Sequence, residues 1–253
     1  MRVTGDSVLT ITLNRPASLN ALDEGLHRGL LAAFESAALS SARAIVLTGE
    51  GRAFSAGGDL EMIRVLQHDL DARHAVLETS RTLFQLLSAF PIPIIAAVNG
   101  PAVGAGCTLA LLCDIVMMAD DAVLADPHVR IGLVPGDGGA VLWPLLAGLG
   151  AARAFLLSGD SLTAAEAYRL GLAYRVFPPH SLMAEATRQA ERIASLPQVA
   201  VRETKQTLNL HVAAAASIFD YGIAAESRSF DSVEHHRRIA NLLGSTPTHE
   251  DRA

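Results

Sequence analysis

The stretch ADPHVRIGLVPGDGG, residues 125–139, holds the residues best suited to acid–base chemistry. His128 and Asp137 stand nine residues apart in it, and Arg130 is the only ionisable side chain between them. An imidazole with an ordinary pKa of about 6.5 exchanges protons at neutral pH, and a carboxylate can orient it or stabilise its charged form. Nine residues on one strand would span roughly 30 Å. We therefore expect the glycines and Pro135 to fold this segment back and to bring both side chains to one cleft.

Each of these two residues also has a purely structural interpretation. A histidine in an apolar segment is often buried and hydrogen-bonded to the backbone, and an aspartate before a helix often caps it. The residue types alone therefore leave catalysis and structure both open for His128 and Asp137.

Two glycine-rich loops could bind an oxygen atom of a ligand. FSAGGDL, residues 54–60, and AVGAGCTLA, residues 102–110, each place small residues directly before a helical pattern. The first N–H groups of a helix lack partners and carry partial positive charge. Two such loops could donate two hydrogen bonds to one oxygen and stabilise an oxyanion. The alternative is that these glycines only permit tight turns.

Several common site motifs are absent from the sequence. Neither GPAVGAG nor GDGGAV has the glycine spacing of a dinucleotide-binding loop, and the chain contains no GxSxG or GxxxxGK[ST] motif. The nine histidines are scattered, and the adjacent pair His235 and His236 fits a solvated helix face better than a metal site. We therefore expect no separate cofactor and no metal ion.

Composition and charge favour a cytoplasmic protein with a large core. Half of the 253 residues are hydrophobic and 18% are charged, which suits one large domain, or a domain of about 200 residues with an appendage. The net charge is −6 and Lys205 is the only lysine, so we expect no nucleic-acid partner. Cys107 and Cys113 are expected to be buried thiols in a reducing compartment. Prolines and an Asn-Gly turn break the apolar run 91–113, which argues against a membrane span, and no leader peptide is expected.

The pattern of elements predicts an α/β fold, because strand, loop and helix alternate over the first 180 residues and helices follow. Thr163 and Glu166 form the sequence pattern of a capping box, Pro144 is expected to bend a helix, and Pro197 is expected to interrupt the helical end of the chain. The tail 245–253 is expected to fray. Strands are predicted within 7–14, 42–51, 91–100, 115–126 and 173–178, and helices within 23–38, 60–89, 104–114, 136–148, 162–172 and from 181 onward.

Five motifs in this order resemble the enoyl-CoA hydratase/isomerase (crotonase) family. They are NRPASLNAL, GRAFSAGGDL, PIPIIAAVNGPAVGAGCTLALLCDIVMMAD, IGLVPGDGG and LSGDSLTAAEAYRLGLAYRVFP. The resemblance covers nearly the whole chain, including the segment SRSFDSVEHHRRIANLL. It implies a spiral of ββα units with the acyl-CoA site in residues 1–195, followed by a helical segment, 196–253, that forms a homotrimer or a hexamer.

The resemblance also implies how an acyl-CoA thioester is held. The backbone N–H groups of Gly58 and Ala105 would bind the thioester carbonyl oxygen, although the family usually has glycine where Ala105 stands. A lysine that is common in the first motif is Ala17 here, so one coenzyme A contact is missing. The residues that remain candidates for contacts with the substrate or coenzyme A are Arg15, Arg52, Ala56, Asp59, Leu60 and Lys205.

The sequence departs from the family at the catalytic positions. Hydratases of the family carry two glutamates, and the matching positions here are Thr108 and His128, twenty residues apart. Thr108 could hold a water but cannot take its proton at neutral pH. The pair His128 and Asp137 resembles instead the β-diketone hydrolase (6-oxocamphor hydrolase) branch of the superfamily. That branch has a further histidine where this chain has Ala105.

We therefore expect an enoyl-CoA hydratase/isomerase-type enzyme, a lyase or an isomerase, with His128 as acid–base group and Asp137 as its partner or as a second acid–base group. Two alternatives stay open. One is a hydrolase that cleaves a carbon–carbon bond of a β-diketone or a β-ketoacyl compound, and the other is a non-catalytic acyl-CoA-binding relative. Coenzyme A would enter only as part of the substrate.

Overall fold

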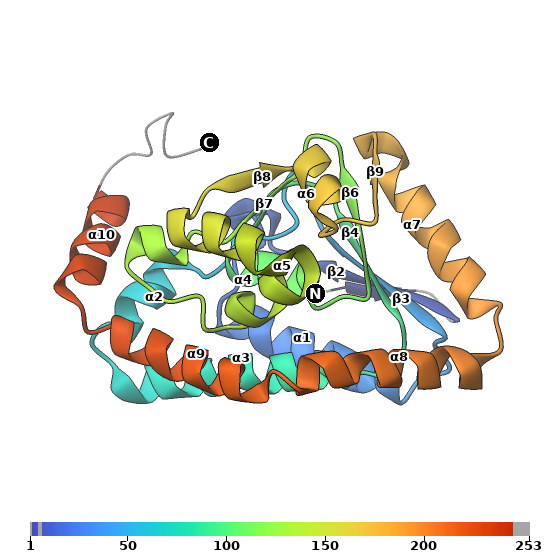
Figure 1. The fold of residues 1–253 in the computed structure, drawn as a ribbon, viewed down its shortest axis with the longest axis horizontal. Helices are drawn as coiled ribbons and strands as arrows, with labels where there is room; N and C mark the ends of the chain where they lie inside the picture. The colour runs from blue at the N-terminus through green and yellow to red at the C-terminus, as the bar shows by residue number, and fades with distance from the viewer. Residues whose placement is uncertain (1, 5–6, 245–253) are drawn as a thin grey trace.

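The computed structural model describes residues 2–4 and 7–244 and has a mixed α/β architecture (Figure 1). The main sheet has six strands in the order β1-β2-β3-β4-β6-β9, in which β1 pairs antiparallel with β2 and all other pairs are parallel. The strands are β1 Arg2–Thr4, β2 Val8–Leu13, β3 Ala44–Gly49, β4 Ile94–Val98, β6 Ile115–Ala119 and β9 Arg175–Phe177. A second sheet joins β5 Ala102–Val103, β7 Val123–Ala125 and β8 Ser161–Thr163 in that order.

The centre of the main sheet is buried on both faces, as parallel strands require. Every residue of β3 and of β4 is buried, which explains their unbroken apolar sequences. Helix α7, Pro179–Ala194, packs against β3, β4 and β6, and α1, Glu24–Ala38, packs against β2 and against α3, Leu70–Ser88. The predicted α/β class with a closing helical segment is confirmed.

The polar stretch predicted as one helix over 60–89 is two helices, α2, Leu60–Leu66, and α3. Asp69 caps the second one by accepting a hydrogen bond from the N–H of Ala72 at 2.9 Å. Arg73 stabilises the break, because its buried guanidinium donates to the carbonyls of Leu66 at 2.8 Å and Gln67 at 3.2 Å. A buried cation that satisfies the free carbonyls at a helix end is a tertiary feature, which the sequence pattern does not contain.

Helix α5, Gly139–Ser158, is bent, but not at the predicted residue. The non-helical backbone lies at Gly148, whose φ of 80° suits glycine, and not at Pro144. Among the described residues α5 is long and apolar enough to cross a membrane by length and composition alone, and the bent pair of α8, Gln198–Ala213, and α9, Ala216–Ser229, meets that test together. The buried Trp143 joins α5 to the core cluster, as expected of a core helix of this composition.

The remaining helices follow the predicted boundaries closely. Helix α4, Ala105–Leu111, begins at the second glycine-rich loop, and α6, Ala164–Leu170, begins with the predicted capping box of Thr163 and Glu166. Pro197 separates α7 from α8, Gln198–Ala213. Helices α9, Ala216–Ser229, and α10, Val233–Gly244, complete the described chain, and the tail 245–253 lies outside the described residues. Helices α8 and α9 run end to end along α3, so the C-terminal segment reaches back to the first half of the chain (Figure 1).

Candidate active site

The two glycine-rich loops lie against each other. The N–H of Ser55 donates to the carbonyl of Pro101 at 3.1 Å, and the N–H of Val103 donates to the carbonyl of Ser55 at 2.9 Å. Gly57 has a φ of 89°, and a Cβ atom there would lie 2.6 Å from the carbonyl oxygen of Val103. Glycine is required at this position both by the backbone angle and by the close approach of the second loop.

Each of the two loops contributes one backbone N–H group that has no partner among the described residues. In the described part of the chain, nothing accepts a hydrogen bond from the N–H of Gly58 or of Ala105. Ala105 is the first residue of α4, where an N–H has no partner within the helix. Both residues line a cavity of about 500 Å³. The alanine that replaces the usual glycine keeps its N–H free.

The cavity has an apolar wall and a polar wall. Of the predicted contact residues, Ala56, Asp59 and Leu60 line it, as do His128 and Asp137. The apolar wall comes mainly from α2, α3 and the loop before α5, with the side chains of Leu60, Ile63, Leu66, Val76, Leu77, Ile131 and Leu133. A volume of this size with few polar groups fits the acyl part of a ligand.

The imidazole of His128 is oriented by Asp126, a residue that the sequence patterns did not suggest. Its Nδ1 atom donates to Oδ1 of Asp126, whose side chain has no exposed surface. The ring also lies beside the second loop, because a Cβ atom on Gly104 would be 3.5 Å from its Cε1 atom. Gly104 is the residue before Ala105, so His128 stands next to one of the two free N–H groups.

Asp137 belongs to the same cluster. Its Oδ1 atom accepts hydrogen bonds from the hydroxyl of Thr108 at 3.1 Å and from the N–H of Gly139 at 3.4 Å. A carboxylate oxygen of Asp126, an imidazole nitrogen of His128 and a carboxylate oxygen of Asp137 all lie within 4.8 Å of one another. The structure therefore brings His128 and Asp137 together, but the carboxylate that holds the ring is Asp126 and not Asp137.

Glu226 is a fourth member, contributed by α9. It is buried, it lines the same cavity, and its Oε2 atom has no hydrogen-bond partner. It stands some ninety residues after Asp137 in a helix whose sequence gives no indication of a site. Only the packing of the C-terminal segment against the first half of the chain reveals it.

Burial and neighbouring charges raise the pKa values of His128, Asp137 and Glu226. Burial alone would lower the pKa of His128, but the carboxylates of Asp126 and Asp137 raise it to about 10. Burial raises the pKa of Glu226 to about 8, and burial also raises the pKa of Asp137. At neutral pH His128 is therefore an imidazolium and Glu226 is mostly neutral. The predicted near-neutral pKa of His128 is corrected by these neighbours.

The distances in this cluster would also suit a divalent cation held by Asp126, His128 and Asp137. Metal ligation requires a deprotonated imidazole nitrogen, whereas the raised pKa of His128, about 10, keeps hydrogens on both ring nitrogens at neutral pH. We therefore interpret the cluster as a site that holds protons. That the protein needs no metal remains a prediction.

Two of the three cations predicted to contact coenzyme A are held by ion pairs of the fold. Lys205 is buried, and its ammonium donates to Asp114 at 2.7 Å and to the carbonyl of Ile92 at 2.8 Å. The structure corrects the prediction for Lys205, because this cation is committed to holding α8 against the sheet. Burial lowers its pKa.

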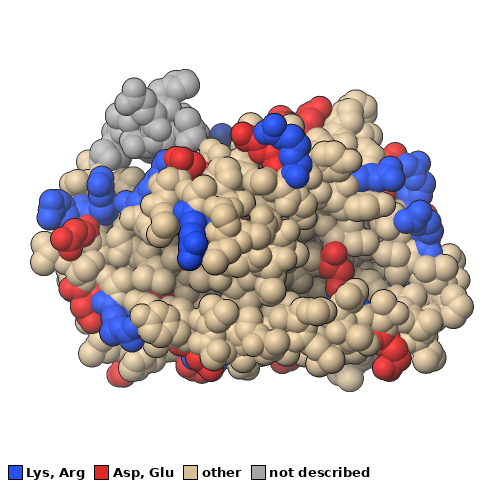
Figure 2. All heavy atoms as spheres, viewed as in Figure 1, with Lys and Arg blue, Asp and Glu red and all other residues tan. Residues whose placement is uncertain are grey.

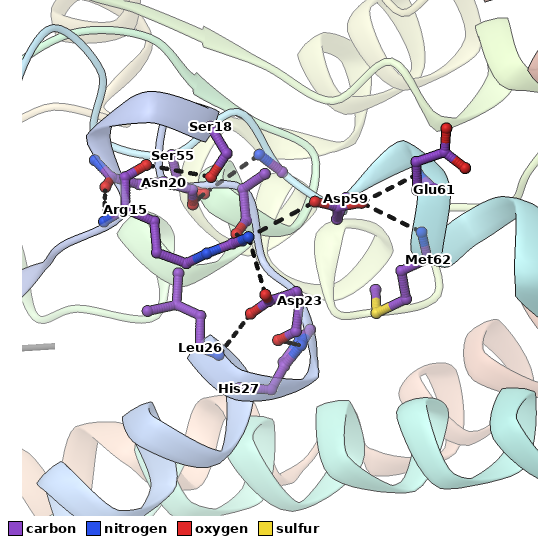
Figure 3. Close-up of polar contacts among 12 residues, drawn as sticks. Arg15, Ser18, Asn20, Asp23, Leu26, His27, Ser55, Asp59, Glu61 and Met62 are labelled. Carbon is purple, nitrogen blue, oxygen red and sulfur yellow. Dashed lines mark hydrogen bonds and ion pairs between the residues drawn. The ribbon is translucent and has the colours of Figure 1, made fainter. Parts of the chain in front are cut away.

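Arg15 lies between the glycine-rich loop 54–60 and the start of α1. Its guanidinium pairs with Asp23 at 3.0 Å, donates to the carbonyl of Ala21 at 2.6 Å, and lies 4.0 Å from Asp59 (Figure 3). Asp59 in turn caps α2 by accepting hydrogen bonds from the N–H groups of Glu61 and Met62. Arg52 is exposed. It remains a candidate for a coenzyme A contact.

The pair His235 and His236 is not a solvated helix face. His235 is fully buried, and its Nδ1 atom lies 2.6 Å from the carbonyl oxygen of Ile131, in the turn that begins with His128. Nε2 of His236 donates to the carbonyl of Phe230, at the end of α9, at 2.9 Å. His235 thus connects α10 to the turn His128–Ile131. The shared helical face of His235 and Ile239, four residues apart and both buried, could have indicated this.

Comparison with known proteins agrees with this fold. The enoyl-CoA hydratase/isomerase family model matches residues 4–246. The chain is 38% identical over 241 residues to the 2,3-dehydroadipyl-CoA hydratase of Escherichia coli (strain K12), covering 93% of this chain and 92% of that protein. It is 38% identical over 227 residues to a probable mitochondrial enoyl-CoA hydratase of Dictyostelium discoideum, covering 88% and 78%. A crystal structure of an enoyl-CoA hydratase/isomerase from Mycobacterium paratuberculosis superimposes with a TM-score of 0.91 at 43% identity, covering 95% of this chain and 97% of that one.

Proposed function

Since this chain belongs to the enoyl-CoA hydratase/isomerase family, we propose that it adds water to the double bond of an enoyl-CoA, with His128 and Asp137 in place of two glutamates. The observation that carries this proposal is the placement of a proton donor and a proton acceptor on one wall of the cavity that also contains the two free N–H groups. Hydration needs both an acid and a base within reach of neighbouring carbons.

The free N–H groups would bind the thioester carbonyl oxygen. As water attacks the β-carbon, electron density moves to this oxygen, and two donors held by the fold stabilise it without rearranging. Gly58 and Ala105 come from two loops that hydrogen-bond to each other, so the spacing of the donors is fixed before the substrate binds.

The proton transfers follow from the pKa directions. The carboxylate of Asp137, made more basic by burial, takes a proton from water while the water oxygen bonds to the β-carbon. The imidazolium of His128 then gives a proton to the α-carbon, and a 3-hydroxyacyl-CoA results. After the reaction Asp137 is protonated and His128 is a neutral imidazole. A return of that proton within the cluster, whose atoms lie within 4.8 Å, restores the starting state.

A direct test compares three substrates: crotonyl-CoA, a β-ketoacyl-CoA and a cyclic β-diketone. We expect crotonyl-CoA to lose its enoyl ultraviolet absorbance and to give the 3-hydroxy product. Migration of the double bond in a 3-enoyl-CoA without net hydration would identify an isomerase instead. Binding of all acyl-CoA compounds without turnover would contradict any catalytic role.

A β-dicarbonyl hydrolase is the second candidate. The observation in its favour is that an imidazole and a carboxylate, and not two carboxylates, form the acid–base pair. In that reaction Asp137 would act as base while water adds to one of the two carbonyl carbons. The bond from this carbon to the carbon between the two carbonyl groups would then break, and His128 would protonate the released carbon. Cleavage of the diketone in the same assay, with crotonyl-CoA untouched, would select this candidate.

The apolar surface of the C-terminal segment supports self-association. The face over α5, α8 and α9 is largely free of charged side chains (Figure 2). The exposed apolar residues of these three helices include Leu145, Leu149, Leu208, Leu210, Ile218 and Tyr221. An uncovered patch of this kind is unusual on a monomer, and we propose that it packs against other copies in a trimer or hexamer. A monomer in sedimentation at micromolar concentration would contradict this.

A further inference from the structure

A small side cavity of about 30 Å³ adjoins the main cavity. The two share four lining residues, His27, Ser80, Ala105 and Asp137, which therefore form the boundary between them. A cavity needs roughly 10–15 Å³ to hold one water molecule, and an acyl chain needs far more. The side cavity thus has room for one or two waters beside the residue whose N–H would bind the thioester oxygen.

Three polar atoms on this boundary have no partner in the described part of the chain. Oδ2 of Asp137 is buried and unpaired, because the hydroxyl of Thr108 and the N–H of Gly139 both contact the other oxygen. No hydrogen bond involves the hydroxyl of Ser80 or the Nε2 atom of His27. Unpaired polar groups in a space of this size are normally satisfied by water, whereas apolar cavities stay dry.

The tautomer of His27 follows from its neighbours. Its Nδ1 atom lies 3.0 Å from the carbonyl oxygen of Asp23, which can only accept, so Nδ1 carries the hydrogen (Figure 3). Burial lowers the pKa of His27, which keeps the ring neutral near pH 7. Nε2 then has a lone pair and acts as a hydrogen-bond acceptor.

We propose that the side cavity binds the water molecule that adds to the substrate, held by Asp137 Oδ2, His27 Nε2 and the Ser80 hydroxyl. The two acceptors take the two hydrogens of the water, and Ser80 donates to one lone pair. The second lone pair is left for the β-carbon, and the hydrogen on Asp137 is the one transferred. His27 is a positioning residue, since it orients the water and Asp137 takes the proton. This inference rests on the proposed hydration.

The kinetic test uses substitutions that separate hydrogen bonding from packing. His27→Leu removes the acceptor and should lower kcat for crotonyl-CoA about 10- to 100-fold with KM unchanged, because a misplaced nucleophile costs about this much. His27→Gln places an amide oxygen near the position of Nε2 and should restore most of the rate. His74→Leu, on the exposed side of α3, is the matched control and should behave as the wild type. A His27→Leu variant with wild-type kcat would overturn the inference.

A high-resolution crystal structure of the wild-type protein provides a readout that needs neither turnover nor a stable variant. We expect an ordered water within hydrogen-bond distance of both Asp137 and His27. Its absence, or a side chain filling the space, overturns the proposed water site even if the enzyme hydrates crotonyl-CoA. If the water is present but no enoyl-CoA is hydrated, the water site stands and the proposed function fails.

Discussion

Nδ1 of His128 donates its hydrogen to Oδ1 of Asp126, the residue two positions earlier, and the side chain of Asp126 is completely buried. This contact fixes the ring and leaves Nε2 as the nitrogen that can act on a ligand. Orienting the ring and taking a proton are therefore assigned to two different aspartates. Asp126 orients the imidazole and stabilises its charged form, while Asp137 accepts a hydrogen bond from Thr108 and is the base in the proposed hydration.

Replacing Asp126 with Asn should lower the pKa of His128. The amide oxygen still accepts the hydrogen of Nδ1, but the negative charge that opposes desolvation is lost. NMR titration of ring-labelled histidine should show the His128 pKa falling from about 10 toward its ordinary value of 6.5. An unchanged His128 pKa in the variant would mean that Asp126 does not stabilise the charged ring.

Protein stability should fall as the pH rises above neutrality. His128 has a folded-state pKa of about 10 against an ordinary 6.5, so its contribution is complete below pH 6.5 and is lost as the pH passes through 10. The pKa of Glu226 is raised from 4.5 to about 8, so its contribution to stability decreases as the pH rises from 4.5 to about 8. Each proton that only the native state retains contributes a slope of about 1.4 kcal/mol per pH unit.

Chemical denaturation at a series of pH values, with Glu226→Gln as comparison, checks this. The variant cannot ionise at this position, so its unfolding free energy should fall less steeply than that of the wild type between pH 4.5 and about 8. Parallel curves for the two proteins would show that Glu226 does not titrate in this range.

Gly58→Pro should reduce turnover about 10²–10³-fold, the usual result of losing one donor to an oxyanion. Gly58→Ala is the matched control, because it keeps the N–H. Its Cβ atom would lie 3.0 Å from Cδ1 of Ile63, the movable end of a side chain, and most activity should survive. The measurement is the steady-state turnover of the two folded variants relative to the wild type. A proline variant that retains more than about a tenth of the activity rules out Gly58 as a donor.

Lys205→Met should destabilise the fold and spare the chemistry. The substitution leaves Asp114 without its cation and the carbonyl of Ile92 without that donor. Because Asp114 is partly exposed, we expect a loss of about 1–3 kcal/mol in unfolding free energy. The KM for an acyl-CoA should stay unchanged in the folded variant. A KM raised tenfold or more would instead return Lys205 to the coenzyme A site.

The fold was predictable from the sequence wherever local patterns decide it. The unbroken apolar runs of β3 and β4 and the capping box at Thr163 each carry their own explanation. One break in the helices was missed and another was misplaced. Arg73 stabilises the gap between α2 and α3 by reaching carbonyls at a helix end, and Gly148 bends α5 where Pro144 was expected to do so.

The candidate site was only partly predictable. His128 and Asp137 stand in one segment, so folding that segment back was enough to bring them together. Asp126 was overlooked although it lies two residues from His128, and Glu226 could not be found without the docking of α9. The raised pKa of His128 was not predictable either, since it depends on the carboxylates that packing places around the ring.

The turnover of crotonyl-CoA by His128→Gln and Asp137→Asn, each measured beside equilibrium binding of the unreactive butyryl-CoA, tests the account most directly. Neither amide can transfer the required proton, so each variant should lose at least about 100-fold in kcat while binding butyryl-CoA as the wild type does. Either variant turning over crotonyl-CoA at the wild-type rate would contradict the assignment of His128 as acid and Asp137 as base.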